Sequence, residues 1–312
     1  MLNRISAVVA LFALCAAAQD SIVSTEQDYV WSTYPTEAPV TAFCFKGSDL
    51  WIAAGGQVTE VNMKRGTLSP YTKIGSMPTA GISTMATDCT GGFWFGGVDG
   101  VAMKKGSKTQ VFTTEDGLPD NAISIVRPAR SKVWVGTPKG AAAYQSGKWK
   151  VYTAKDGLVG DNVTAIIIDM KDRAWLGTDK GISMFDGAAW KSHTMQNGLS
   201  WNETLALGVD RRNGRIWAAV GEGDVNRWDG KEWKVFMSIQ EGINSIMADT
   251  QGRVWFGSDS GLLKYNGMEW VTDPDKLGVS AASVSQLAID DAGNMYFGTA
   301  RGVMRLANPY PF

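Results

Sequence analysis

Apolar residues gather in short runs along the chain, and polar turn residues separate the runs. One copy of the pattern reads "VTAIII", "AWLGT", "GISMF" and "AWKSHT" between residues 163 and 194. The breaks between these runs are rich in Asp and Gly, as in "TDKG" and "FDGA". Runs of about 4–8 residues bounded by turn signals are typical of β-strands, so each copy predicts a four-stranded antiparallel sheet.

An aromatic residue in the second run of each copy sets the period of the repeat. The intervals between successive aromatic residues are 43, 40, 41, 42, 38 and 41 residues. Repeats of about forty residues with four strands each have the period of a propeller blade. The sequence therefore predicts an all-β fold, a seven-bladed β-propeller of four-stranded antiparallel blades. The aromatic column consists of Trp51, Trp94, Trp134, Trp175, Trp217, Trp255 and Tyr296.

The first run of each copy is predicted to be the innermost strand of its blade. Its apolar character is almost continuous, as expected for a strand that is covered on both faces. Its fourth residue is large and its third is mostly small, which fits a fold that narrows toward an axis. Gln286 is the exception at the third position. The large residues are Met85, Ile166, Leu207, Ile246 and Leu287.

The two ends of the repeat region complement each other. After Tyr296 the chain has a third run, "GVMRL", but no fourth. The missing run is found at the start, where "YVWSTY" at residues 29–34 repeats the pattern of fourth runs such as "KWKVYT". We predict that Trp31 to Tyr34 completes the last blade, closes the ring and removes its open sheet edges.

The start of the chain has the features of a secretory signal peptide. One Arg precedes an apolar core from Ile5 to Leu14, and three alanines follow it. No later run reaches the roughly 20 apolar residues that a membrane-spanning helix needs. We expect a signal peptide at 1–18, a short segment at 19–27, a single propeller domain at 28–308 and a tail at 309–312. Cleavage near Ala18 would leave a periplasmic or secreted protein.

Composition and charge exclude several classes of protein. A hydrophobic content of 44% with 10% aromatic residues excludes a disordered chain. With 30 Lys and Arg against 31 Asp and Glu, the balanced charge gives no reason to expect binding to nucleic acid or anionic lipid. Cys44 and Cys89 lie at different columns of neighbouring repeats, and both a disulfide and two buried thiols remain open.

The repeats resemble a known family. "VWVGTPKGAAAY", "AWLGTDKGISMF" and "VWFGSDSGLLKY", joined by "EDGLPDNAIS" and "KDGLVGDNVTAI", are similar to the two-component regulator propeller repeat. This family builds the extracytoplasmic sensor modules of hybrid histidine kinases and also occurs in stand-alone secreted proteins. The resemblance spans residues 28–306 and implies a propeller with a binding role. Since the sequence shows no membrane span, kinase or response domain, signalling is not implied.

Most of the aromatic residues belong to the scaffold. Twelve of the 13 tryptophans fall in columns that repeat from blade to blade, as the stacking of blades requires. Trp201, in "NGLSWNETLAL", matches no column. His193 occupies the position of Tyr152 and Phe236 in other copies and is predicted to pack in an outer strand. The remaining columns contain Trp31, Trp149, Trp190, Trp233 and Trp270 in the fourth runs and Trp228 in the third.

Strand alternation places the loops on two faces of the propeller. Loops from a fourth strand to the next first strand share one face with the second-to-third hairpins, and we call this the acidic face. The first hairpins, "RPARSK", "KDR", "RRNGR" and "QGR", form the opposite, basic face. Binding residues tend to lie on loops that a rigid scaffold holds. The candidate ligand-binding residues of the acidic face are Trp201, Asn202, Glu203, Asp161, Asn162, Asp120, Asn121, Glu222, Asp179 and Arg301.

Simpler interpretations remain open for parts of both faces. Asp-Gly and Asn-Gly pairs also fit plain turn chemistry, and the three arginines of "RRNGR" fit a solvated hairpin as well as an anion site. "NVT" at 162 and "NET" at 202 are glycosylation acceptors if the source glycosylates secreted proteins. With one His and no Cys cluster, the sequence offers no zinc ligands. We expect no cofactor, and calcium at the acidic face stays an open alternative.

Three functions fit these observations. The first is an exported, monomeric, non-catalytic binding module that recognises an extracellular small molecule, glycan or protein at the acidic face. The second is a lyase or hydrolase that uses paired carboxylates in the central mouth, such as Glu203 and Glu222. The third is a structural surface or assembly protein. The scarcity of His favours binding over catalysis, and we assign no catalytic residue and no metal site.

Overall fold

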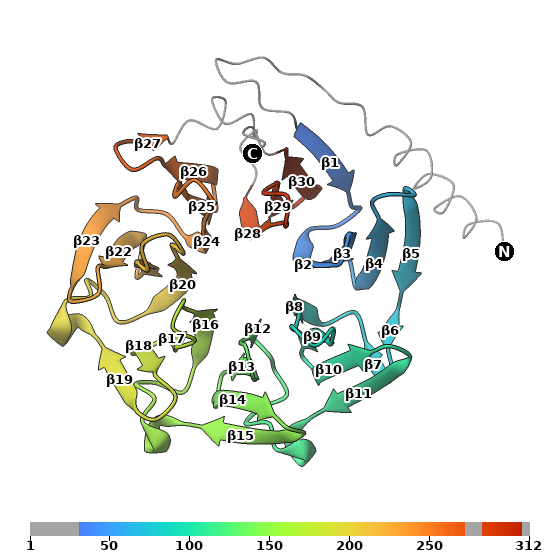
Figure 1. Cartoon of the computed structure of the whole chain (residues 1–312), viewed down its shortest axis with the longest axis horizontal. Coiled ribbons are helices and arrows are strands. Elements are labelled where there is room, and N and C mark those ends of the chain that lie inside the picture. The colour runs from blue at the N-terminus through green and yellow to red at the C-terminus, as the bar shows by residue number, and fades with distance from the viewer. Residues whose placement is uncertain (1–30, 272–282, 308–312) are drawn as a thin grey trace.

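The computed structural model describes residues 31–271 and 283–307, and they form a ring of seven four-stranded antiparallel sheets (Figure 1). The predicted seven-bladed propeller is confirmed. The signal peptide at 1–18, the segment at 19–27 and the tail at 309–312 lie outside the described residues. Within these described ranges, no helix is long and apolar enough to cross a membrane.

The blades follow one another in chain order, each from its innermost to its outermost strand. Blades 1 and 2 contain β2 (Val40–Lys46), β3 (Asp49–Ala54), β4 (Gln57–Asn62) and β5 (Thr67–Tyr71), then β8 (Ile82–Thr87), β9 (Phe93–Gly97), β10 (Gly100–Lys105) and β11 (Lys108–Phe112). Between them lies a small hairpin of β6 (Lys73–Ile74) and β7 (Met77–Pro78). Blades 3 and 4 contain β12 (Ile125–Pro128), β13 (Val133–Thr137), β14 (Gly140–Gln145) and β15 (Lys148–Tyr152), then β16 (Val163–Ile168), β17 (Ala174–Thr178), β18 (Gly181–Phe185) and β19 (Trp190–His193).

The last three blades complete the ring. Blades 5 and 6 contain β20 (Thr204–Val209), β21 (Ile216–Val220), β22 (Asp224–Trp228) and β23 (Trp233–Ser238), then β24 (Ile243–Ala248), β25 (Val254–Ser258), β26 (Gly261–Tyr265) and β27 (Trp270–Val271). Blade 7 contains β28 (Val284–Ile289), β29 (Met295–Thr299), β30 (Gly302–Leu306) and β1 (Trp31–Pro35). Three 3-10 turns precede blades 3, 4 and 5: η1 (Thr114–Asp116), η2 (Ala154–Asp156) and η3 (Met195–Asn197).

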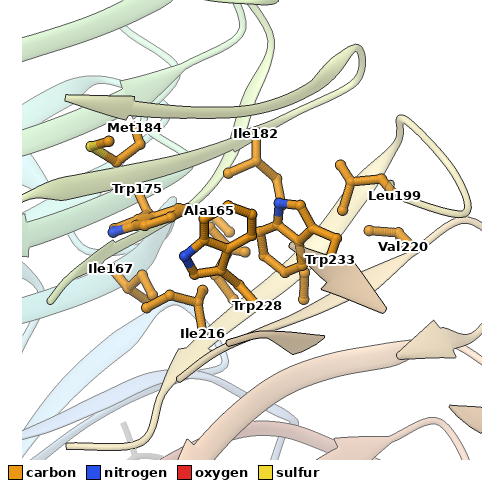
Figure 2. Packing of buried hydrophobic residues seen from close by; sticks show 12 residues of the cluster. Ala165, Ile167, Trp175, Ile182, Met184, Leu199, Ile216, Val220, Trp228 and Trp233 are labelled. Atoms are coloured by element: carbon orange, nitrogen blue, oxygen red, sulfur yellow. The ribbon is translucent and has the colours of Figure 1, made fainter. Parts of the chain in front are cut away.

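The aromatic column forms the contacts between blades. All seven members are at most 3% exposed. Figure 2 shows the packing between blades 4 and 5, where Trp175 of β17 lies beside Trp228 and Trp233, with ring centroids 6.2 and 6.3 Å apart. Each blade therefore buries the aromatic residue of its neighbour, and the column that repeats in the sequence is the core of the fold.

The first and last parts of the repeat region meet in blade 7, as predicted. β1 pairs with β30 in antiparallel register from Trp31 opposite Leu306 to Pro35 opposite Gly302. Gln286 closes the inner side of the same junction. Its amide accepts a hydrogen bond from the Phe43 N–H and donates one to the Phe43 carbonyl, both at 2.9 Å. This exception to the small-residue column thus joins blade 7 to blade 1.

Side-chain hydrogen bonds also join the innermost strands of neighbouring blades. In six blades, a polar residue at the start of the innermost strand donates to a main-chain carbonyl in the next blade. Leu205 occupies this position in blade 5 and carries no donor. The six donors are Thr41, Ser83, Ser124, Thr164, Asn244 and Ser285. The bonds hold adjacent blades in register around the centre of the ring, so the loops at this end stand on a rigid support.

An aspartate in the first hairpin binds the aromatic column in four blades. In blade 4, the Asp169 carboxylate accepts hydrogen bonds from the Trp175 indole at 3.0 Å and the Arg173 Nε at 2.6 Å. It also accepts the Lys171 and Arg173 backbone N–H groups. The sequence analysis missed this pairing, although an Asp precedes the aromatic residue by six positions in each of these blades. The four aspartates are Asp88, Asp169, Asp249 and Asp290.

Replacing Asp169 by Ala is expected to destabilise the propeller by about 3 kcal/mol, because the buried indole and guanidinium N–H groups lose their acceptor. Burial acts to raise the pKa of Asp169, but its hydrogen bonds to Trp175 and Arg173 outweigh this, and the pKa falls below 3.8. The carboxylate therefore stabilises the fold above about pH 4, and this contribution is lost as pH falls toward the folded pKa.

Urea denaturation followed by circular dichroism from pH 7 to pH 2 measures this prediction. The difference between the native chain and Asp169→Ala should stay constant down to about pH 4 and then shrink. Asp291→Ala is the matched control, since Asp291 is exposed in the corresponding hairpin of blade 7. Equal losses for the two variants would show that the indole contact contributes nothing.

Candidate functional site

Backbone hydrogen bonds assemble the acidic face as the strand alternation predicts. The loops that enter each blade lie against the second-to-third hairpins. The Gly221 N–H donates to the Glu203 carbonyl at 2.9 Å, and the Asp179 N–H donates to the Asn162 carbonyl at 3.3 Å. Five of the six donors that join the innermost strands are exposed, so solvent reaches the inner strands from this face.

Trp201 stands on the acidic face of blade 5 and is 48% exposed. Its five-membered ring lies against the α-carbon of Gly221, where a β-carbon would collide with it. Gly221 also has a φ of +58°, in the left-handed region that favours glycine. The hairpin of β21 and β22 therefore supports one side of the indole. Unlike the column tryptophans, Trp201 leaves half of its surface to solvent.

Three predicted site residues hold the 3-10 turns of this face. Asn121, Asp161 and Asn202 each accept, through Oδ1, the backbone N–H of the residue seven positions earlier. The distances lie between 2.6 and 2.9 Å. In each case the acceptor fixes the turn to the loop that enters the next blade. These oxygen atoms stabilise turns, although the sequence analysis gave the turn interpretation only to Asp-Gly and Asn-Gly pairs, to which these residues do not belong.

The other predicted residues differ in their partners. Asp120 forms an ion pair with Lys139 at 2.8 Å and accepts the Ala122 N–H at 2.9 Å. The Ala122 hydrogen bond and then the Lys139 contact lower the pKa of Asp120. The Asp179 carboxylate lies over Gly160 in the same blade. Exposed positions on this face are Asn162, Asp179, Glu203, Glu222 and Arg301.

Some of the predicted ligand-binding residues lie close together in the structure, and others lie in different blades. Trp201, Glu203 and Glu222 lie on two hydrogen-bonded segments of blade 5. Arg301 lies in the hairpin between β29 and β30, in a blade across the ring from blade 3 (Figure 1). The strongest local cluster is therefore in blade 5, where one exposed tryptophan and two exposed glutamates lie on neighbouring backbone segments.

His193 lies away from this cluster, in outer strand β19. It is 1% exposed and stacks on Trp175 with ring centroids 5.3 Å apart. Burial, then the charges of Lys191 and Arg173, lower its pKa to about 4. The imidazole is neutral at pH 7 and packs as the aromatic residues of other blades do.

The described residues show neither a cluster of metal ligands nor a disulfide bond. Among the described residues, no group of three or more His, Cys, Asp or Glu is placed to hold a metal ion. Cys44 and Cys89 are free, with Cys44 partly buried and Cys89 exposed. Burial raises the pKa of Cys44, so its thiol is protonated at neutral pH.

Arg127, the first residue of "RPARSK", lies on innermost strand β12 and not in the basic hairpin to which the sequence analysis assigned it. Arg127 pairs with Trp134 across the ladder, at the position that Cys44, Ala86 and Ala288 occupy in other blades. In the sequence, its signal is an Arg inside the apolar run "SIVRPA". A charge in a column of small and apolar residues marks a position that the scaffold alone does not explain.

Comparison with known proteins supports the fold. No family model matches the chain, and no curated protein matches it by sequence. The extracellular domain of BT3049, described as a hybrid two-component system of B. thetaiotaomicron, superposes with a TM-score of 0.73 at 19% identity. The alignment covers 92% of this chain and 44% of that one, so the chain spans less than half of this neighbour.

Two further solved structures share the architecture over nearly their whole length. YCF48 bound to D1 peptide aligns with a TM-score of 0.69 at 16% identity, covering 92% of this chain and 98% of that one. A catalytically inactive virginiamycin B lyase from Staphylococcus aureus with quinupristin aligns with a TM-score of 0.72 at 10% identity, covering 90% and 99%. The BT3049 extracellular domain shares the propeller fold that the resemblance of the repeats implies. At these identities, the similarities establish the fold.

Proposed function

We propose that this chain is an extracytoplasmic, non-catalytic recognition module that binds its ligand at the acidic face of blade 5. The observation that carries the proposal is the half-exposed Trp201, which Gly221 supports from behind. An exposed indole is costly in water, and this one matches none of the repeating columns that fill the gaps between blades. The loop that carries it stands on a closed ring of hydrogen-bonded sheets, so we expect little ordering entropy to be lost on binding.

The surroundings of Trp201 favour a hydroxyl-rich ligand such as a glycan. An aromatic face packs against the C–H groups of a sugar ring, and carboxylates accept hydrogen bonds from its hydroxyls. Glu203 and Glu222 supply exposed carboxylates on the two segments that meet at this indole. The extracellular sensor domain and the peptide-bound YCF48 support the use of this architecture for recognition outside the cytoplasm or of a protein partner.

A glycan array followed by thermal-shift titration of the best glycan tests the proposal. We expect that glycan to raise the melting temperature of the native chain, and Trp201→Ala to weaken binding about five- to thirtyfold. The loss follows from removing the stacking surface, which contributes about 1–2 kcal/mol in comparable contacts. Val98→Ala is the matched control, because Val98 is 63% exposed on the same face in the β9–β10 hairpin of blade 2.

Unchanged affinity in Trp201→Ala would contradict the proposal, and an equal loss in Trp201→Ala and Val98→Ala would show that the effect is not specific to the indole. If no glycan on the array binds and a protein crosslinks to residue 201, the binding site remains on the acidic face but its ligand is a protein. Crosslinking elsewhere on the ring would support the structural or assembly function instead.

A carboxylate-dependent lyase or hydrolase is the second candidate, and one observation favours it. The Gly221 N–H to Glu203 carbonyl bond brings the predicted pair Glu203 and Glu222 onto adjacent segments. Acid–base chemistry on a bound glycan needs two such groups. If the native chain cleaves a bound glycan, and Glu203→Gln and Glu222→Gln abolish cleavage but retain binding, the site is catalytic and the non-catalytic proposal is wrong.

A further inference from the structure

Two buried hydrogen-bond donors of blade 5 have no acceptor within the described residues. They are the indole N–H of Trp217 on β21 and the Nε–H of Arg227 on β22 (Figure 1). Trp217 is 2% exposed, and both nitrogen atoms are closed to solvent. Buried donors in folded proteins are nearly always satisfied by protein, water or a bound ion, so this pair calls for an acceptor.

The two side chains are in contact. Trp217 and Arg227 lie directly opposite each other in the antiparallel ladder of β21 and β22. The guanidinium carbon of Arg227 lies 5.6 Å from the centre of the Trp217 ring and 4.5 Å from the centre of the Phe236 ring. These two cation–π contacts hold the guanidinium beside the indole.

Blades 4 and 6 show what satisfies the same two kinds of donor. In each of them, an indole N–H and an arginine Nε donate to one carboxylate oxygen, Oδ2 of Asp169 or of Asp249. The guanidinium carbons there lie 5.5 and 5.8 Å from the indole centres, as in blade 5. Arg227 approaches its indole from β22 and not from the first hairpin, but the separation is the one at which a single acceptor atom serves both donors.

The first hairpin of blade 5 does not supply this carboxylate. Its closing bond runs from the Asp210 N–H to the Arg215 carbonyl, five residues on, whereas the hairpin of blade 4 closes four residues on. The Asp210 carboxylate accepts the Asn213 side-chain amide and the Arg212 N–H. Trp217 lies seven positions after Asp210, one more than in the four blades with an Asp–aromatic bond.

No carboxylate pairs with Arg227 in the described part of the chain. The salt bridges there involve other residues. The Asp229 carboxylate, two positions away, accepts backbone N–H groups of its own turn, and Glu232 pairs with Lys234. A guanidinium forms stronger hydrogen bonds to a charged acceptor than to a neutral one, so an anion suits this place better than a water molecule.

The arginines of "RRNGR" affect this place through the length of their hairpin. Arg212 donates to the Gln251 carbonyl of blade 6 and holds the hairpin against its neighbour. Arg211 and Arg215 are exposed, as expected of a solvated hairpin. The extra residue of the motif is what separates Asp210 from the indole.

We propose that Trp217 and Arg227 form a binding site for a small anion at the contact of blades 5 and 6. The anion takes the place that the Asp169 carboxylate holds in blade 4 and accepts from both the indole and the guanidinium. Because both nitrogen atoms are closed to solvent, the ligand is a single ion such as chloride or a small carboxylate such as formate. The site is independent of Trp201.

Thermal unfolding at constant ionic strength in sodium chloride, bromide, formate or gluconate tests the site. Chloride, bromide and formate are expected to raise the melting temperature by about 3 °C over gluconate, which is too large to enter. Arg227→Met should abolish this difference, and Arg211→Gln, on the exposed hairpin, should keep it. In crystals grown with bromide, an anomalous peak is expected between Trp217 and Arg227.

A chain without Asn213 provides a second test, because its hairpin has the length found in blade 4. Asp210 should then accept the Trp217 indole N–H, and the melting temperature should no longer depend on the anion.

Two results would overturn the site. One is a difference between chloride and gluconate that is equal in the native chain and in Arg227→Met. The other is a crystal with an ordered water and no bromide peak at these side chains, which would make water the acceptor. If Arg227→Met fails to fold, the bromide map of the native chain and the chain without Asn213 still decide.

Discussion

A chain that begins at residue 36 is expected to lose at least about 5 kcal/mol of folding stability relative to a chain that begins at residue 29. That loss is comparable with the whole stability of many domains. The cause is the removal of β1, which supplies the outermost strand of blade 7 and carries the ladder to β30. Without it, the backbone of β30 becomes an open edge, and the ring loses the strand that joins its two ends.

Urea denaturation followed by circular dichroism and tryptophan fluorescence measures this loss. A synthetic peptide of residues 29–37, added to the shortened chain, should restore a cooperative transition because it can pair with β30 in the native register. A peptide with the same residues in scrambled order is the control. If the shortened chain unfolds at the same urea concentration as the longer one, β1 does not close the ring.

The architecture could be predicted because the same packing problem recurs in every blade. An aromatic residue that must fill the gap to the next blade returns at nearly constant spacing, as Trp134, Trp175 and Trp217 do. The missing fourth strand was visible for the same reason, since Trp31 to Tyr34 repeats a pattern that the last copy lacks. The repeat period therefore predicts those residues that every blade needs for its packing.

Interactions between particular blades could not be predicted in this way. Gln286 was only an exception in a column until the structure placed its amide on Phe43, 243 residues earlier in the chain. In the sequence, Asp169 looks like an ordinary turn residue. Its hydrogen bond to the Trp175 indole depends on how the hairpin folds back. The first contact depends on which blades become neighbours and the second on the path of a hairpin, and the sequence of one strand contains neither.

The candidate site was predictable in part for the same physical reason. Subtracting the repeating columns isolates Trp201, and the structure gives that residue an exposed position. The same subtraction could not tell a turn residue from a binding residue, because Asn202 and Asp161 have side chains suited to both. Arg127 was assigned to the basic hairpin "RPARSK", because the short run around it did not show that innermost strand β12 extends to Pro128.

If Trp134 belongs to the scaffold and Trp201 to the binding site, their replacement by Ala should lower the folding stability by very different amounts. Trp134→Ala is expected to cost about 4 kcal/mol of folding stability, because the ring is buried against Tyr152 and Phe185 and leaves a cavity between blades 3 and 4. Trp201→Ala should cost less than about 1 kcal/mol, since half of its surface is already in water and its ring lies against a glycine.

Urea denaturation of both variants at one pH compares them directly, with Trp149→Ala as an intermediate case. Trp149 is partly buried in outer strand β15 and packs against Phe112, so its loss should fall between the other two. The proposed site depends on the order of these three values. If Trp201→Ala loses as much folding stability as Trp134→Ala, Trp201 belongs to the scaffold. Its presence on blade 5 would then be explained without a ligand.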